Sequence, residues 1–289
     1  MNAFYDAHLH FHFDTLVPHH AAVIADLVRV GIKAVVVNGT NEDEWPVVAS
    51  LCSDVSARHP PLRLLPSYGV HPWDCGQRSP DWQNKLRAAI AADPCAGVGE
   101  IGLDRWIIDG IRPDDPRITG LRVAPLAEQT EVFAWQLALA AEFNRAASIH
   151  ATQAYGAALD VLRGAKKLPA RGFLMHGYGG PAEMIRPFAD LGAYFSFNVE
   201  LLAPRQASRR ENFKAIPADR LLVETDAPVK APSPELNRFP LGTAADGSVI
   251  NHPANLTVAY EALAELRGVP VDTLATTVAG NFHRLFGAE

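Results

Sequence analysis

The chain has 289 residues, of which 48% are hydrophobic, so it can bury a large core and has the length of two modest domains or one α/β barrel. Its 26 basic and 32 acidic residues give a formal net charge of -6, which excludes non-specific binding of nucleic acid through an overall positive field. The three cysteines are too scattered for a disulfide framework, and no signal-peptide pattern or membrane-length apolar run is present, so we expect a soluble cytoplasmic protein.

The first predicted element is a strand over residues 4–10. Its Asp6, His8 and His10 occupy alternate positions, so their side chains project to one face of the strand. Taken alone, this pattern fits a polar strand end with two hydrogen-bonded histidines as well as it fits a pair of metal ligands. The choice depends on whether ligand-type residues also follow later strands.

Helices and strands alternate through the rest of the chain. The helix predicted over residues 19–30 has apolar side chains at helical spacing and stops at Gly31, and residues 33–39 form a β-branched run typical of strands buried on both faces. Further strands are predicted at residues 62–69, 96–103, 146–150, 172–176, 193–198 and 221–226. Further helices are predicted at residues 44–58, 82–92, 127–144, 157–165, 181–191, 209–215, 255–267 and 273–286.

About eight strands separated by helices predict a closed (β/α)8 TIM barrel, with residues 1–289 as a single domain because no long linker marks a boundary. An open doubly wound sheet is the alternative, but no Gly-x-Gly-x-x-Gly turn follows the first strand. Two segments, residues 106–125 and 231–254, are too irregular for ordinary connections. Loops of this length are usually functional or disordered.

Ligand-type side chains gather at the predicted strand ends. The carboxyl ends of barrel strands share one face, where the chemistry of such barrels takes place, so these side chains are expected to converge. Five of the 11 histidines lie at such ends, which is more than chance placement explains. The set comprises His8, His10, His71, Glu100, His150, His176, Glu224 and Asp226.

Imidazoles and carboxylates together predict a site for one or two divalent metal ions, with Mg, Zn, Mn and Ni as candidates. Glu100 is the natural bridge between two ions, since each of its oxygens can face one of them. Its neighbours Gly97, Gly99 and Gly102 allow close approach of the backbone. Asp226 is predicted both to bind metal and to take a proton from the attacking water.

Three further residues have roles that the pattern leaves open. His71 precedes Pro72 and is either a site residue or a fixed turn residue. Glu224 suits direct catalysis and a buried supporting pair equally well. Asp6 lies one step deeper in the barrel than His8, so we expect it to orient a ligand instead of binding the metal.

Over nearly the whole chain, these motifs resemble those of the TatD-related metal-dependent hydrolases. The motifs are, in order, Asp6-Ala7-His8-Leu9-His10, Gly69-Val70-His71-Pro72, Gly99-Glu100-Ile101-Gly102-Leu103-Asp104, Ser148-Ile149-His150 and Glu224-Thr225-Asp226-Ala227-Pro228. The resemblance implies a (β/α)8 barrel with a divalent metal site and, for characterised relatives, hydrolysis of DNA phosphodiesters. It implies that His71 contacts the substrate phosphate or the leaving group. It also implies a set of metal ligands, namely His8, His10, Glu100, His150, His176 and Asp226.

The chain departs from the family pattern close to these motifs. Thr152 stands where relatives commonly have an arginine, which removes a candidate phosphate contact. Lys230 takes the place of the usual leucine. We expect Arg105, Arg112 or Lys230 to supply the positive charge that the arginine would have given.

We therefore predict a divalent-metal-dependent phosphodiesterase, a deoxyribonuclease of the 3′-5′ exonuclease type that acts on DNA or an oligonucleotide with metal-activated water. The first alternative is a hydrolase of a small ester, lactone or amide, which the negative net charge and the absent arginine favour. The second alternative is a barrel that binds metal without catalysis. The complete ligand set argues against that second alternative.

Overall fold

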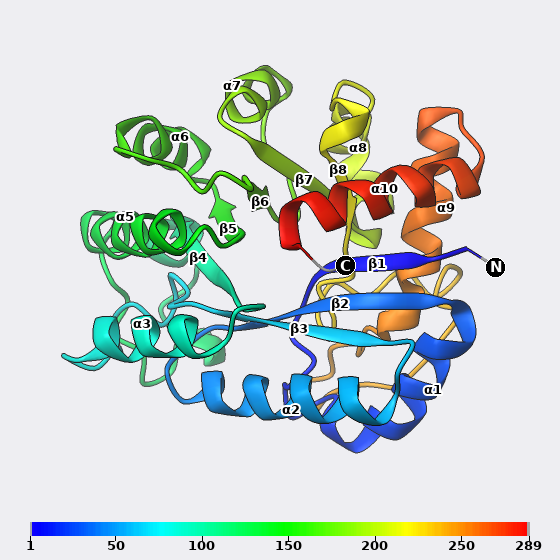
Figure 1. The fold of residues 1–289 in the computed structure, drawn as a ribbon, viewed down its shortest axis with the longest axis horizontal. Helices are drawn as coiled ribbons and strands as arrows, with labels where there is room; N and C mark the ends of the chain where they lie inside the picture. The colour runs from blue at the N-terminus through cyan, green and yellow to red at the C-terminus, as the bar shows by residue number, and fades with distance from the viewer. Residues whose placement is uncertain (1, 288–289) are drawn as a thin grey trace.

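The computed structural model describes residues 2–287 and contains one sheet of eight strands, with helices on the outside (Figure 1). The strands follow one another in chain order around the sheet, and each is parallel to the next. This confirms the predicted (β/α)8 architecture. The strands are β1 (Phe4–Leu9), β2 (Ile32–Gly39), β3 (Arg63–Tyr68), β4 (Gly97–Asp104), β5 (Ala147–Thr152), β6 (Phe173–Met175), β7 (Ala193–Phe197) and β8 (Leu221–Val223).

Backbone hydrogen bonds join the last strand segment to the first. The N–H of Asp226 donates to the carbonyl of His8 at 3.0 Å, and the N–H of His10 donates to the carbonyl of Ala227 at 2.7 Å. Both bonds lie just beyond β8. They bring the polar residues that follow β1 and β8 next to each other.

The helices lie close to their predicted positions. The first, α1 (His20–Val30), ends at Gly31, whose φ of 88° is in the left-handed region and whose N–H donates to the carbonyl of Leu27. The others are α2 (Glu44–Arg58), α3 (Trp82–Ala92), α4 (Trp106–Asp109), α5 (Leu126–Phe143), α6 (Tyr155–Gly164), α7 (Ile185–Asp190), α8 (Ala207–Asn212), α9 (Leu256–Arg267) and α10 (Val271–Phe286). No helix among residues 2–287 is long and apolar enough to cross a membrane.

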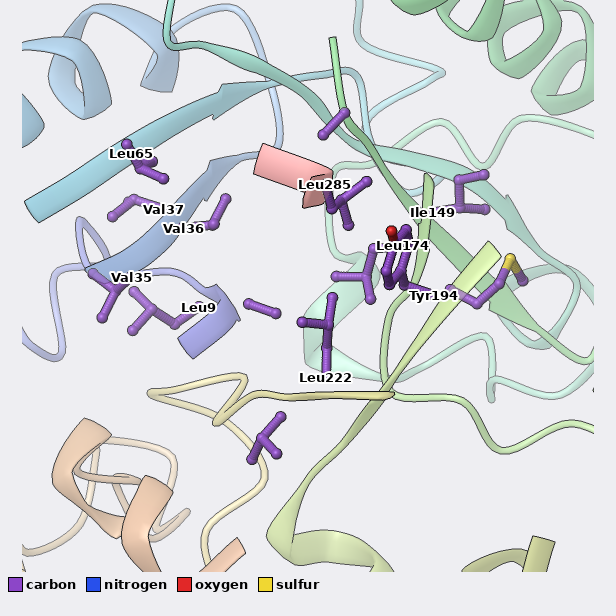
Figure 2. Packing of buried hydrophobic residues seen from close by; sticks show 14 of the residues in the cluster. Leu9, Val35, Val36, Val37, Leu65, Ile149, Leu174, Tyr194, Leu222 and Leu285 are labelled. Atoms are coloured by element: carbon purple, nitrogen blue, oxygen red, sulfur yellow. The ribbon is translucent and has the colours of Figure 1, made fainter. Parts of the chain in front are cut away.

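The core fills the barrel and the space between the sheet and its helices. Successive residues Val35, Val36 and Val37 of β2 are all buried, so both faces of the strand are covered, as the β-branched run predicted. Figure 2 shows buried side chains from several strands, together with Leu285 of α10. Burial on both sides makes the strands a rigid support for the residues at their ends.

The last helix covers the end of the barrel opposite those residues. The Nδ2 of Asn281 in α10 donates to the carbonyl of Leu221, where β8 begins, at 2.7 Å. The ring of Phe282 packs 4.9 Å from that of Tyr5, near the start of β1. Figure 1 shows α10 running close to β1. In this way α10 holds the first and last strands together at their amino ends.

Two predicted regions differ in detail. The segment 106–125 is not wholly irregular, since it contains α4 and a 3-10 helix at Pro116–Ile118. The prediction that the last strand reaches residue 226 was wrong, because β8 ends at Val223 and Asp226 has a φ of 54°, which is incompatible with an extended strand. That residues 1–289 form a single domain stays a prediction.

Candidate metal centre

The carboxyl ends of the strands surround a cavity of about 530 Å³. This is the face of a (β/α)8 barrel that carries catalytic sites. The candidate ligands on its wall are His10, Glu100, His150, His176 and Asp226, and His71 lines it as well. His8 lies immediately behind, with a side chain that is fully buried.

Glu100 lies at the centre of this group. Its Oε2 is 3.3 Å from the Nε2 atoms of both His8 and His10. Its Oε1 is 2.8 Å from the Nδ1 of His150 and 2.8 Å from the Nε2 of His176. The two oxygens of one carboxylate therefore face two different sets of imidazoles.

Burial alone would raise the pKa of Glu100. The surrounding imidazoles, His71 and His176 foremost, outweigh burial and hold that pKa well below its usual value. Glu100 is therefore an anion in a buried site, and a buried anion needs a positive partner.

Asp226 completes the set on the Oε2 side. Its Oδ1 is 3.9 Å from the Nε2 of His8 and 3.6 Å from the Nε2 of His10. Among residues 2–287 there are three groups of three potential ligand atoms in which the atoms of each group lie within 4.8 Å of one another. They are His8, Glu100 and His176; His8, His10 and Asp226; and His71, Glu100 and His150.

One orphaned atom indicates that a cation fits here. The Nε2 of His8 is buried and has no hydrogen-bond partner among residues 2–287, although it faces two carboxylates. A buried polar atom without a partner is costly unless something else satisfies it. A divalent ion that accepts nitrogen and carboxylate ligands would do so.

Neighbouring groups contact the imidazoles of His8 and His10 at the nitrogens that point away from the carboxylates. The Nδ1 of His10 donates to the backbone carbonyl of Asn38 at 2.8 Å, which leaves the lone pair on Nε2 directed toward the carboxylates. The Nδ1 of His8 is 2.9 Å from the hydroxyl of Ser148. Contacts of this kind fix both the ring orientation and the tautomer of metal-binding histidines.

Asp104 contacts the ring of His150 in the same way, and this contact was not predicted from the sequence. Its Oδ2 is 3.0 Å from the Nε2 of His150 and accepts a hydrogen bond from the indole of Trp73 at 2.8 Å. Burial opposes ionisation of Asp104, but these hydrogen bonds outweigh it and lower its pKa. The motif that contains Glu100 also contains Asp104, and its place at the end of β4 was the available signal.

His71 is oriented as a hydrogen-bond donor. Its Nδ1 accepts the backbone N–H of Trp73 at 3.2 Å, so the neutral ring carries its proton on Nε2. That Nε2 is 3.3 Å from the Oε1 of Glu100 and faces the cavity. This tautomer suits contact with an anionic oxygen better than it suits metal binding.

Glu224 lies behind the wall of the cavity and is fully buried. Its carboxylate accepts hydrogen bonds from the hydroxyl of Ser196 and, at 3.0 Å, from the amide of Asn198. Its Oε1 is also 3.6 Å from the Nδ1 of His176. Glu224 therefore lies beside His176 and away from the cavity wall, and the choice between its two roles stays a prediction.

Asp6 contacts backbone and hydroxyl groups, and no hydrogen bond joins it to an imidazole of the site. Its carboxylate accepts from the N–H groups of His8 and Thr225 at 3.2 and 3.0 Å, and from the Thr225 hydroxyl at 2.5 Å. Asp6 therefore holds together the chain segments that carry His8 and Asp226.

Residues 5–287 match the family described as TatD related DNase. The chain belongs to this family. It is 30% identical over 220 residues to the uncharacterized metal-dependent hydrolase YcfH of Escherichia coli, covering 76% of this chain and 72% of YcfH. It is 28% identical over 272 residues to the 3'-5' ssDNA/RNA exonuclease TatD of Klebsiella pneumoniae, covering 93% and 92% of the two chains. The crystal structure of the TatD homologue YjjV from E. coli has the same fold, with a TM-score of 0.81 at 24% identity over 99% of this chain and 98% of that one.

Membership of the TatD family confirms the resemblance seen in the motifs and makes the chain a metal-dependent hydrolase. The close packing expected around Glu100 is also present. A Cβ on Gly102 would lie 2.0 Å from the carbonyl oxygen of His150, and one on Gly99 would lie 2.7 Å from the Cβ of Ser148. Only glycine fits at these two positions of β4.

The positive charge at the site of this TatD-family chain comes from residues that were partly unexpected. Lys230 lines the cavity as one of three candidates, whereas Arg105 and Arg112 do not. Arg117, from the segment after α4, lines it instead and lies 5.0 Å from the ring centroid of Trp106. The sequence singled out that segment but contained no signal for Arg117 itself.

Proposed function

We propose that this hydrolase cleaves phosphodiester bonds in DNA or oligonucleotides, from the 3′ end, with water activated at a centre of one or two divalent cations. The observation that supports it most is the position of Glu100, whose two oxygens face separate sets of imidazoles. A pair of ions on either side of a carboxylate is a recurring arrangement in nucleases and phosphatases. The exonuclease name of the relatives at 28% identity supports the choice of substrate.

The proposed ligands divide between the two oxygens of Glu100. His8, His10 and Asp226 lie on the Oε2 side, and His150 and His176 lie on the Oε1 side. Divalent ions held there, whether Mg, Zn, Mn or Ni, would lower the pKa of water and stabilise the charge that develops on the phosphoryl oxygens. This nitrogen-rich set suits zinc, manganese or nickel better than magnesium.

The protein side chains have separate tasks in the proposed reaction. Asp226 accepts the proton of the attacking water, because its carboxylate faces the cavity beside the proposed ligands. The Nε2–H of His71 donates to a phosphate oxygen or to the leaving oxygen. Asp104 and Glu224 hold the rings of His150 and His176 in place.

A second candidate is the hydrolysis of a small ester, lactone or amide. Thr152 on the cavity wall, at the position where relatives commonly have arginine, favours it, because the site then has less charge for a phosphate. The same metal-activated water and the same base would serve this reaction.

The two candidates separate in one experiment. The metal-loaded protein is incubated with a single-stranded oligonucleotide and, in parallel, with a panel of small esters, lactones and amides. We expect release of nucleotides from the 3′ end, and a fall in kcat of about 100-fold or more in Asp226→Asn, the range for loss of a general base. Asp160→Asn, at an exposed carboxylate outside the cavity, is the matched control and is expected to leave the rate unchanged. Turnover of the small substrates alone would overturn the phosphodiesterase proposal.

A further inference from the structure

The cavity above Glu100 continues into a second one. This neighbouring cavity, of about 580 Å³, lies over the ends of β5 to β7 and reaches α8. The two cavities share Thr152, Tyr155, Gly177, Asn198 and Lys230 as lining residues. A substrate held at the metal centre can therefore extend directly into the second cavity.

A short side chain, that of Thr152, lies where the two cavities meet. The residue lies at the end of β5 and borders both cavities. Its side chain has only a methyl and a hydroxyl beyond the Cβ, so it occupies little of the shared space. A longer side chain would project into the region where the two cavities meet.

Two cationic side chains line the second cavity. Lys230 lies on the wall that both cavities share, and its Nζ is 2.6 Å from the Oε2 of Glu200. Arg209, from α8, lines the second cavity only, and its Nη1 donates to the neutral amide of Gln206 at 3.0 Å. Among residues 2–287 no carboxylate forms a salt bridge with Arg209. Two cations against one carboxylate leave the cavity with an excess of one positive charge.

The hydroxyl of Tyr155, a neutral hydrogen-bond donor, also lines the second cavity. The hydroxyl of Tyr155 accepts the N–H of Gly179 at 3.1 Å, which leaves its own hydrogen free to donate. An added Cβ on Gly179 would lie 3.5 Å from that hydroxyl and 3.6 Å from the Cδ of Arg209. The guanidinium and the phenol hydroxyl thus line the same cavity near Gly179, and together they suit an anion with several oxygens.

We propose that this second cavity holds the phosphate next to the scissile one, contacted by Lys230 and Arg209. The proposal rests on the proposed phosphodiesterase function and adds to it a subsite for the neighbouring nucleotide. It also explains how a chain of net charge -6 without an arginine at position 152 retains a polyanionic substrate. In this proposal the positive charge contacts the phosphate next to the scissile one instead of the scissile phosphate itself.

A matched pair of substrates tests the subsite. The thymidine dinucleotide with a single internal phosphodiester is compared with the same dinucleotide carrying an added 5′ phosphate. We expect the wild type to show a lower KM for the phosphorylated form. Arg209→Ala and Lys230→Ala are each expected to reduce this preference by about tenfold, the typical effect of one charge-assisted hydrogen bond. Arg209→Lys is expected to restore part of it.

Arg205→Ala is the matched control, since Arg205 also pairs with Glu200, at 3.1 Å, but does not line the second cavity. We expect this variant to keep the wild-type preference. An equal change of KM for both dinucleotides in Arg209→Ala and Lys230→Ala, or no change for either, would overturn the subsite.

A binding measurement separates this subsite from the reaction itself. Binding of oligothymidylate is measured in an Asp226→Asn background over a range of salt concentrations. The logarithm of the binding constant falls as the logarithm of the salt concentration rises. Loss of each phosphate contact is expected to make this slope less steep by about 0.7. If the wild type cleaves neither dinucleotide, the proposed function fails, but a less steep slope in the Arg209→Ala variant would still support the subsite and an unchanged slope would refute it.

Discussion

At the scale of single residues, the imidazoles around Glu100 share one design. Each ring has one nitrogen directed toward the carboxylate, and a protein group lies at its other nitrogen, within hydrogen-bond distance in four of the five rings and 3.6 Å away at His176. The contacting groups are the Ser148 hydroxyl for His8, the Asn38 carbonyl for His10, the Trp73 N–H for His71, the Asp104 carboxylate for His150 and the Glu224 carboxylate for His176. His71 differs from the other rings because its Nδ1 accepts a hydrogen bond from a backbone N–H, whereas the other four rings face a hydroxyl, carbonyl or carboxylate oxygen.

The Asp104→Asn variant tests this design with little change of volume. Loss of the negative charge behind His150 is expected to weaken binding of the metal ion by about 10- to 100-fold, the usual effect of removing such a partner. Competition with a chromophoric chelator measures the affinity. Asp109→Asn, which alters an exposed carboxylate paired with Arg105, is the control. A metal affinity within twofold of the wild type in Asp104→Asn would contradict the assigned role.

The sequence predicted which residues gather at the site but not how each is oriented. Parallel barrel strands bring their carboxyl ends together whatever the side chains are, so His8, Glu100 and Asp226 could be assigned from position alone. The donor role of His71 depends on a backbone N–H two residues away, and the approach of Arg117 depends on the path of a long loop. Neither follows from periodicity or spacing.

At the scale of elements, the short strand β8 is anchored by the last helix. β8 has only three residues, yet the segment that follows it carries Glu224 and Asp226. The Nδ2 of Asn281 in α10 donates to the carbonyls of Ala218 and Leu221, which flank the start of β8. These bonds hold the strand whose other end supplies the proposed base.

The Asn281→Ala variant is therefore expected to lower the free energy of unfolding by about 2 kcal/mol, because it removes the donor to the buried carbonyl of Leu221. Urea denaturation provides the measurement. In Thr277→Ala, on the exposed face of the same helix, we expect a change of no more than about 0.5 kcal/mol. Equal effects in the two variants would show that α10 does not anchor β8 through Asn281.

The alternation of helices and strands could be predicted because buried parallel strands and amphipathic helices have distinct periods. The residue at which β8 ends could not be predicted, because residues 221–226 contain apolar and β-branched residues that favour an extended strand. Hydrogen bonds of Asp6 with Thr225 and of Asp226 with His8 accompany the turn of the chain out of the strand. These contacts join residues far apart in the sequence, which local preferences do not include.

At the scale of the whole molecule, the segment between β8 and α9 packs back onto α1. His252 is buried there, with its Nε2 3.4 Å from the Oδ2 of Asp26 and its Nδ1 accepting the N–H of Ala254 at 2.9 Å. Burial lowers the pKa of His252 to about 4, although Asp26 opposes the shift. The folded protein therefore holds this ring in its neutral form.

A pH dependence of stability follows from that shift. The unfolded chain takes up a proton on His252 near its ordinary pKa of about 6.5, whereas the folded chain does so only near 4. The contribution of His252 is fully present above about 6.5 and is lost as the pH falls toward 4, by about 3 kcal/mol in all. Denaturation of wild type and His252→Gln between pH 7 and pH 4 measures it, with His59→Gln at an exposed ring as the control. A difference between wild type and His252→Gln that stays constant across this range would refute the assignment.

The centre around Glu100 is the feature on which the proposed chemistry depends, and diffraction from crystals grown with Mn²⁺ tests it most directly. Data collected at the manganese absorption edge locate the ion without assumptions about the reaction. We predict anomalous density on the Oε2 side of Glu100, between His8, His10 and Asp226, and at full occupancy a second peak on the Oε1 side beside His150 and His176. Absence of density at both positions, in protein that remains folded and saturated with manganese, would contradict the account.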